Sequence, residues 1–395
     1  MRIQPTELKE RIIAIDVMRG FALLGIFVVN MLFFHTPYIY INPYTWFQIP
    51  GDFEVFKWID IFVQGSVYPL FSMLFGYGLA MQFMKTQEKG ASFTKLAVRR
   101  LLILLVIGCI HAFLIWSGDI LITYALAGLV LILMMRLKPV WLLLISAILF
   151  IVPMGFLNGL VYLMAKIDPN SVVIYTAIQK IEASIIAYSQ GSWVDVFWQR
   201  LDDWLYMTQY GAIILTILFM IVPFLLVGAA AAKLKLIERA RELKLFWIIT
   251  IIITLAAGTA IKWLPFLTEA NALTASVQDT FGGPLQAIAY AGIIALICTI
   301  PFMQKLLSPI AKAGRMSMTI YLMQSIIATT IFYAYGFGLY GQIDIRTGTW
   351  MAIGIYVLQI VFAEVWFMKF KQGPVESLWR KLTYSNISLK KDEKG

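Results

Sequence analysis

The residues best suited to chemistry are a histidine and an aspartate that end a long apolar stretch, Arg100 to Asp119. His111 is one of two histidines in the 395-residue chain, and Asp119 follows it across a turn-forming Ser117 and Gly118. Ionisable side chains are costly at membrane depth, so they are functional candidates by default. We predict that Asp119 accepts a hydrogen bond from one imidazole nitrogen and leaves the other as a general base. The alternative is a histidine bonded to a neighbouring helix for packing.

A second polar group lies in the first apolar segment. Asp16 and Arg19 are three residues apart and share a helix face, and Asn30, eleven residues after Arg19, returns to nearly the same face. The guanidinium fork suits phosphate, so we expect this face to bind a phosphate-bearing donor. Two arginines at the basic ends of other segments are expected to join it: Arg100 and Arg315. An ion pair that only holds helices together is the alternative.

Composition places these residues in a membrane protein. The chain is 60% hydrophobic and 14% charged, whereas charged residues make up roughly a quarter of a soluble globular protein. Runs of about 20 apolar residues predict an all-α polytopic protein with ten transmembrane helices in a single domain, 1–383, before a disordered tail, 384–395. The expected spans are 12–34, 58–84, 97–116, 119–135, 139–165, 208–232, 245–266, 284–303, 315–336 and 348–369.

The basic residues set the orientation. Of the 32 lysines and arginines, 25 lie at alternate loops on one side of the predicted membrane, six lie on the other, and Arg19 lies within the first span. The positive-inside rule therefore places both termini in the cytoplasm and predicts an inner, cytoplasmic membrane of the cell. The net charge of +10 follows from these loops, so we expect the bilayer as partner and no nucleic acid.

The longest outer segment, 166–207, mixes tryptophans and charges at helical spacing. We expect helices that lie in the outer interface, either as an aromatic belt or as a lid over an outward-facing cavity. A second outer segment, 279–284, contains two glycines and a proline. It is expected to form a turn that leads into a helix with the proline near its first position.

The remaining polar residues are assigned lesser roles. Ser72 and Gln324 are expected to contact substrate, although bonds between helices explain most such residues. His35 is expected at the solvated outer end of the first span, and Glu364 is expected to be neutral or paired with Lys369. Two histidines and two cysteines without ligand spacing predict no metal site.

Several stretches together resemble the YeiB family of bacterial multi-span membrane proteins, most of whose members are uncharacterised. The resemblance covers nearly the whole chain and implies a fold more firmly than an activity. The stretches are LFSMLFG at 70–76, HAFLIWSGDILITYAL at 111–126, GRMSMTIYLMQS at 314–325, GPVE at 373–376, LWR at 378–380 and LTY at 382–384.

More distantly, the face formed by Asp16, Arg19 and Asn30 is similar to the first span of the transmembrane acyltransferase superfamily. That resemblance implies transfer of an acyl group from cytoplasmic acyl-CoA, such as acetyl-CoA, to a membrane or cell-envelope acceptor. The type-three members have histidine where this chain has Asn30, so we expect His111 with Asp119 to supply the base. A transporter of a small or lipid-like substrate, and a non-catalytic scaffold or sensor, are the alternatives; the oligomeric state is left open.

Overall fold

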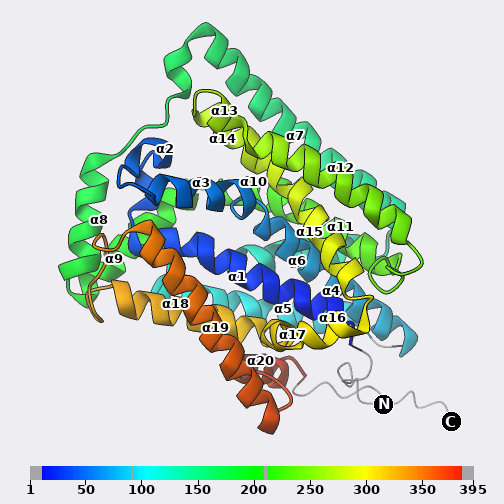
Figure 1. The fold of residues 1–395 in the computed structure, drawn as a ribbon. Helices are drawn as coiled ribbons and strands as arrows, with labels where there is room; N and C mark the ends of the chain where they lie inside the picture. Colours follow the sequence, from blue (N-terminus) through cyan, green and yellow to red (C-terminus); the bar gives the residue numbers. More distant parts are fainter. Residues whose placement is uncertain (1–10, 91, 209–211, 385–395) are drawn as a thin grey trace, which may run out of the picture.

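The structure is a computed structural model that describes residues 11–90, 92–208 and 212–384. Across these residues every regular element is a helix, which confirms the all-α fold. Figure 1 shows a bundle with α1 through its centre, α8 and α9 at one end, and α16 and α20 at the other. Of the predicted tail, only Tyr384 is among the described residues.

All ten predicted spans correspond to apolar helices in the described part of the chain. Eight are long enough to cross a bilayer. They comprise α1 (Ile13–His35), α3 (Asp52–Phe62) with α4 (Val67–Glu88), α5 (Phe93–Ile110) with the π turn η3 (His111–Ile115), α7 (Pro139–Ile167), α10 (Ile213–Thr216) with η6 (Ile217–Ile221) and α11 (Val222–Lys233), α12 (Lys244–Lys262), α14 (Ala272–Val277) with η7 (Gln278–Gly282) and α15 (Gly283–Ile297), and α19 (Ile345–Lys369).

The other two spans are shorter: α6 (Leu121–Met134) and α18 (Ser317–Phe332). Their 14 and 16 residues reach about 21 and 24 Å at a rise of 1.5 Å per residue, less than the ~30 Å hydrocarbon core. Both helices pack largely inside the bundle. Residues near the start of each helix line a cavity described below.

Short elements connect the spans. On the outer side they are η2 (Tyr38–Tyr40), α2 (Pro43–Trp46), η4 (Pro169–Val172), α8 (Ile178–Gln190), α9 (Trp193–Thr208) and α13 (Leu264–Leu267). On the basic side they are α16 (Pro301–Leu306), α17 (Ser308–Arg315) and α20 (Pro374–Tyr384). The helices expected in the outer segment 166–207 are therefore present as α8 and α9.

Glycines allow the central helices to approach closely, as is common where helices meet in a membrane. On α4 and α11, Gly76 lies against the Leu225 carbonyl and Gly228 against the Met73 carbonyl, with no space for a Cβ atom at either glycine. α17 packs against the first half of α1 in the same way, because Gly314 lies against the Asp16 backbone. These contacts fix the helices that surround the candidate site.

The expected turn at 279–284 is wrong. The chain is helical without a break from Ala272 to Ile297, and η7 widens it into a π turn just before Pro284. Proline cannot donate the usual backbone bond inside an α-helix. The π turn changes the bonding pattern at that point, so the helix accommodates Pro284 without ending.

Two single-residue expectations are also wrong. His35 is fully buried, with its Nδ1 at the Met31 carbonyl, because the loop after α18 and the start of α19 cover it. Glu364 pairs with Lys312 on α17, and not with Lys369, because α17 packs beside α19. In both cases a helix distant in sequence supplies the contact.

We expect Gly228→Ala to lower the stability of the protein, because the added methyl would collide with the Met73 carbonyl on α4. Overpacking of this kind costs about 1–3 kcal/mol. The matched control is Gly155→Ala on α7, where a Cβ meets nothing within 4 Å. Thermal unfolding in detergent should show a lower midpoint for Gly228→Ala alone, and equal midpoints for both variants would contradict the packing described.

Candidate functional site

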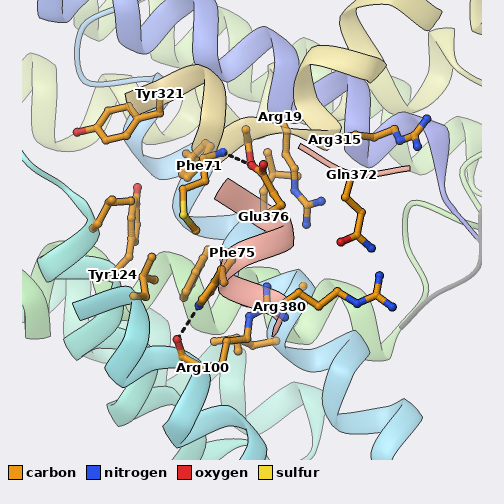
Figure 2. A pocket seen from close by; sticks show the side chains of 18 of the residues that line it. Arg19, Phe71, Phe75, Arg100, Tyr124, Arg315, Tyr321, Gln372, Glu376 and Arg380 are labelled. Atoms are coloured by element: carbon orange, nitrogen blue, oxygen red, sulfur yellow. Dashed lines mark hydrogen bonds between the residues drawn. The ribbon is translucent and has the colours of Figure 1, made fainter. Parts of the chain in front are cut away.

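A cavity of about 290 Å³ lies at the basic ends of α1, α5 and α18, beneath α20. Its lining is cationic at the basic end and aromatic deeper in the bundle. Figure 2 shows Arg19, Arg315 and Arg380 at one side, and the rings of Phe71, Tyr124 and Tyr321 at the other. The basic lining residues are Arg11, Arg19, Arg100, Arg315, Lys371 and Arg380, and Glu376 is the one carboxylate among the described lining residues. We call this space the inner cavity.

Asp16 positions two of these arginines without lining the cavity. Its carboxylate oxygens lie 3.3 Å from Arg11 Nη1 and 3.4 Å from Arg19 Nη1. Across the cavity, Gly78 on α4 leaves room for the Arg19 guanidinium, since a Cβ there would lie 3.2 Å from Nη2. The ion pair between Asp16 and Arg19 therefore serves the cavity and does not cross-link two spans.

α20 closes the inner cavity through two sets of contacts. Glu376 accepts hydrogen bonds from the backbone N–H groups of Met318 and Thr319, at 2.7 and 3.0 Å, and from the Thr319 hydroxyl at 2.6 Å. Trp379 donates from Nε1 to the Arg100 carbonyl at 2.9 Å, and the Arg100 guanidinium lies 4.3 Å above its ring. The Glu376 carboxylate is thus bonded to the start of α18. It leaves most of the basic residues that line the inner cavity without a counter-ion among the described residues.

The pKa values of two arginines outside the membrane spans are lowered in this arrangement. Burial lowers the pKa of Arg315 from its ordinary value, and the nearby charge of Arg11 lowers it further. Burial likewise lowers the pKa of Arg380. Guanidinium groups remain protonated in proteins despite such shifts. A ligand with several negative charges would relieve their mutual repulsion, so the inner cavity is suited to phosphate groups.

His111 and Asp119 form a buried pair at the end of α5. The imidazole Nδ1 lies 2.7 Å from Asp119 Oδ1, and both side chains are completely buried. Asp119 Oδ2 accepts a second bond from the Ile122 N–H at 2.8 Å. His111 Nε2 has no hydrogen-bond partner among the described residues. A carboxylate only accepts hydrogen bonds, so a proton on Nδ1 would be donated to Asp119 and would leave Nε2 as the nitrogen available to a substrate.

The π turn η3 begins at His111, where α5 ends. Such turns occur often at functional sites, because the extra residue per turn redirects side chains. After η3 the backbone becomes extended at Trp116 and reaches Asp119 just before α6. The pair therefore joins the ends of two helices.

A second cavity, of about 270 Å³, lies on the outer side of the pair, and we call it the outer cavity. The 116–119 segment lines it, so Asp119 belongs to its wall. On the inner side, Tyr321 lines the inner cavity, and its ring centre lies 5.0 Å from that of His111. The histidine and aspartate therefore stand in the wall between the two cavities.

The lining of the outer cavity is aromatic and polar but carries little charge. Its residues include Phe33, Trp116, Ser117, Thr123, Trp204, Met207, Thr208 and Thr216. α9 contributes Trp204, Met207 and Thr208, which is the placement that a lid would need. The lid remains a prediction, since one arrangement of α9 is described.

The predicted site residues divide between these places. Arg19, Arg100 and Arg315 line the inner cavity. Along its own helix, Arg100 lies about 16 Å from His111. Asn30 was expected with the donor-binding arginines but lines the outer cavity instead. Asn30 is eleven residues after Arg19, so it lies on a similar face of α1 but about 16 Å farther along the helix. It is therefore beyond the wall that separates the two cavities.

The two residues expected to bind substrate lie in helix packing instead. Ser72 is fully buried, and its hydroxyl bonds to the Tyr68 carbonyl and lies 3.1 Å from the Tyr124 hydroxyl. Gln324 donates to Gln359 on α19 at 3.2 Å. Neither lines the inner or the outer cavity. Their hydrogen bonds join helices, as most polar groups in membrane bundles do.

Sequence reasoning missed several lining residues of the inner cavity. Arg11 lies just before the first span, and Lys371 and Arg380 follow the last one, where basic residues are ordinary features of cytoplasmic loops. An available signal was the helical pattern of 374–384, which places Glu376, Trp379 and Arg380 within one amphipathic helix after the last span.

Sequence comparisons find relatives that match nearly the full length of the chain. The chain is similar to "Uncharacterized protein YxaH" of Bacillus subtilis (strain 168), with 34% identity over 97% of this chain and 96% of the relative. It is similar to "Uncharacterized protein YeiB" of Escherichia coli (strain K12), with 30% identity over 95% and 96%. A Bacillus acidopullulyticus protein, "Uncharacterized 39.9 kDa protein in amylase 3'region", is 26% identical over 99% of both. Residues 231–386 match the family described as "Protein of unknown function (DUF418)".

Proposed function

The chain belongs to the YeiB family of membrane proteins, and we propose that it is an acyltransferase which moves an acyl group from cytoplasmic acyl-CoA to an acceptor on the outer side. One observation carries the proposal: a cationic inner cavity and an outer cavity with Asp119 as the one charged residue of its described lining meet at a wall that contains the His111 and Asp119 pair. We place the protein in the cell membrane, because the basic side of the bundle suits the cytoplasmic leaflet.

The donor would bind with its phosphates among the arginines of the inner cavity. Arg19 and Arg315 offer guanidinium groups from α1 and α17, and Arg380 offers a third from α20. The pantetheine arm would follow the apolar wall formed by Phe71, Phe75 and neighbouring residues of α4. The thioester would then lie at the deep end, near Tyr124 and Tyr321.

The transfer step requires a base on the acceptor side of the thioester. His111 Nε2 would take the proton of an acceptor hydroxyl or amine while the acceptor oxygen or nitrogen attacks the thioester carbon. The carbon–sulfur bond breaks, the thiolate of CoA leaves, and the proton held on His111 returns to the sulfur or to solvent. Asp119 would stabilise the imidazolium through the 2.7 Å bond to Nδ1. Tyr321 stands between cavity and histidine, so its side chain must shift, or the acyl group must pass beside it.

A transporter is the second candidate, and the two cavities on opposite sides of a closed wall are the observation that favours it. In that case His111 and Asp119 would lie on a substrate or proton pathway. The two functions differ in a measurable product. A transporter moves solute across proteoliposomes without consuming thioester, whereas an acyltransferase releases free CoA.

We expect acetyl-CoA to raise the thermal midpoint of the purified protein, since a ligand selective for the folded state stabilises it. Arg19→Ala or Arg315→Ala should weaken binding about tenfold or more, because each removes a charge-assisted hydrogen bond worth about 1.5–3 kcal/mol. Arg239→Ala is the control, because Arg239 is exposed and paired with Glu242 outside the cavity. Equal affinities in all three variants would contradict the donor site.

We expect His111→Gln and Asp119→Asn to slow transfer by at least about a hundredfold while leaving acetyl-CoA binding intact. The measurement is release of free CoA thiol by proteoliposomes supplied with a cell-envelope extract as the acceptor mixture. Cys109→Ala, on the same helix two residues before His111, is the matched control and should keep the parental rate. Parental rates in folded His111 and Asp119 variants would refute the proposed mechanism.

A further inference from the structure

A cluster of three ionisable residues and one glutamine lies at the outer ends of the helices, away from both cavities. It comprises Lys262 at the end of α12, Asp60 on α3, and Gln278 and Asp279 on the π turn η7. Figure 1 shows α3, α13 and α14 near one another at the end of the bundle opposite α16 and α20. The proposed acyl transfer does not use this cluster.

Lys262 neutralises one of the two carboxylates. Its side chain is completely buried, and Nζ lies 2.6 Å from Asp279 Oδ1. Asp279 Oδ2 lies 3.5 Å from Gln64 Nε2, so this carboxylate has a partner at each oxygen. The backbone is fitted closely here, because Gly65 adopts a φ of +72° beside Asp279 and Gly283 lies against the Gly65 carbonyl. Asp279, whose side chain is 34% exposed, therefore serves as the partner that the buried Lys262 ammonium requires.

Asp60 has donors at one oxygen only. Its Oδ2 accepts from Gln278 Nε2 at 2.6 Å and from the Tyr44 hydroxyl at 3.2 Å, and Gln278 also donates to Tyr44 at 2.8 Å. Within the part of the chain that the structure describes, Asp60 Oδ1 and Gln278 Oε1 have no hydrogen-bond partner, although the two residues are 1% and 0% exposed. Buried acceptors without a donor are costly, so Asp60 Oδ1 and Gln278 Oε1 are the atoms that a cation or a hydrogen-bond donor would contact.

The charge count leads to the same requirement. The cluster holds two carboxyl groups, Asp60 and Asp279, against one amine, Lys262, so one further monovalent cation would balance its charges. No group of three or more histidines, cysteines or acids suited to a metal ion occurs among the described residues. Carboxylate and amide oxygens favour hard cations, and a single excess charge fits a monovalent one.

We infer that Asp60 and Gln278 form a binding site for one monovalent cation, a proton or a sodium ion, at the outer face of the protein. The cation would interact with Asp60 Oδ1 and Gln278 Oε1 and complete the charge balance with Lys262 and Asp279. Its binding would tie α3 to η7, which are 218 residues apart at the Asp60 and Gln278 contact. The inference is independent of acyl transfer, because neither residue lines the inner or the outer cavity.

The test is the thermal midpoint of the purified protein in sodium, potassium or choline chloride at equal ionic strength, at about pH 8 and about pH 6. A sodium site predicts a midpoint higher by about 2 °C or more in sodium than in choline chloride at the higher pH. A proton site predicts no sodium effect, and a similar rise in choline chloride when the pH is lowered.

Asp60→Asn removes the charge and should abolish whichever response the parental protein shows. Glu54→Gln is the matched control, because Glu54 lies on the same helix, is exposed and should leave the response unchanged. Gln278→Met, which replaces the amide group with an apolar thioether of similar size, should weaken the response and serves if Asp60→Asn does not fold. The inference is overturned if the parental protein shows neither response, or if Asp60→Asn or Gln278→Met responds as the parent does.

Discussion

The hydrogen bond between His111 and Asp119 joins the end of α5 to the start of α6 inside the wall that separates two cavities. Burying this pair is costly unless each group is oriented and bonded. The π turn that begins at His111 orients the imidazole, and the Ile122 N–H donates a hydrogen bond to the second oxygen of Asp119. No described residue bonds to the remaining imidazole nitrogen, and the proposed mechanism assigns the proton transfer to that atom.

The inner cavity depends on a different constraint, the concentration of positive charge. Asp16 holds Arg11 and Arg19 in place, and Glu376 is engaged at the start of α18, so neither carboxylate neutralises the remaining cations. α20 contributes both an anchor, Trp379, and a cation, Arg380, to the cavity. α20 therefore both covers the inner cavity and adds to its positive charge, so under the proposed function donor binding would depend on the position of α20.

The sequence was sufficient for the all-α membrane fold, because apolar runs of about 20 residues are a strong signal. The division of basic residues between two sides of a membrane stays a prediction from the loop lysines and arginines. The sequence also singled out His111 and Asp119, since ionisable residues are rare in apolar spans. It failed where the partner lies on a helix distant in sequence. Burial of His35, the pairing of Glu364 with Lys312, and the packing roles of Ser72 and Gln324 follow from tertiary contacts that no local pattern encodes. The spacing between Arg19 and Asn30 predicted that they share a helix face. It did not predict that a wall of packed residues separates the cavities that they line.

The central claim is that a donor thioester reaches the histidine through the inner cavity. The most direct test is a cryo-EM structure of the protein with a non-hydrolysable acetyl-CoA analogue. We predict density for the phosphates beside Arg19, Arg315 and Arg380, and for the acyl end against Tyr321 on the His111 side. Density for the analogue elsewhere on the protein, or an acyl end that points away from His111 toward the basic face, would contradict the account.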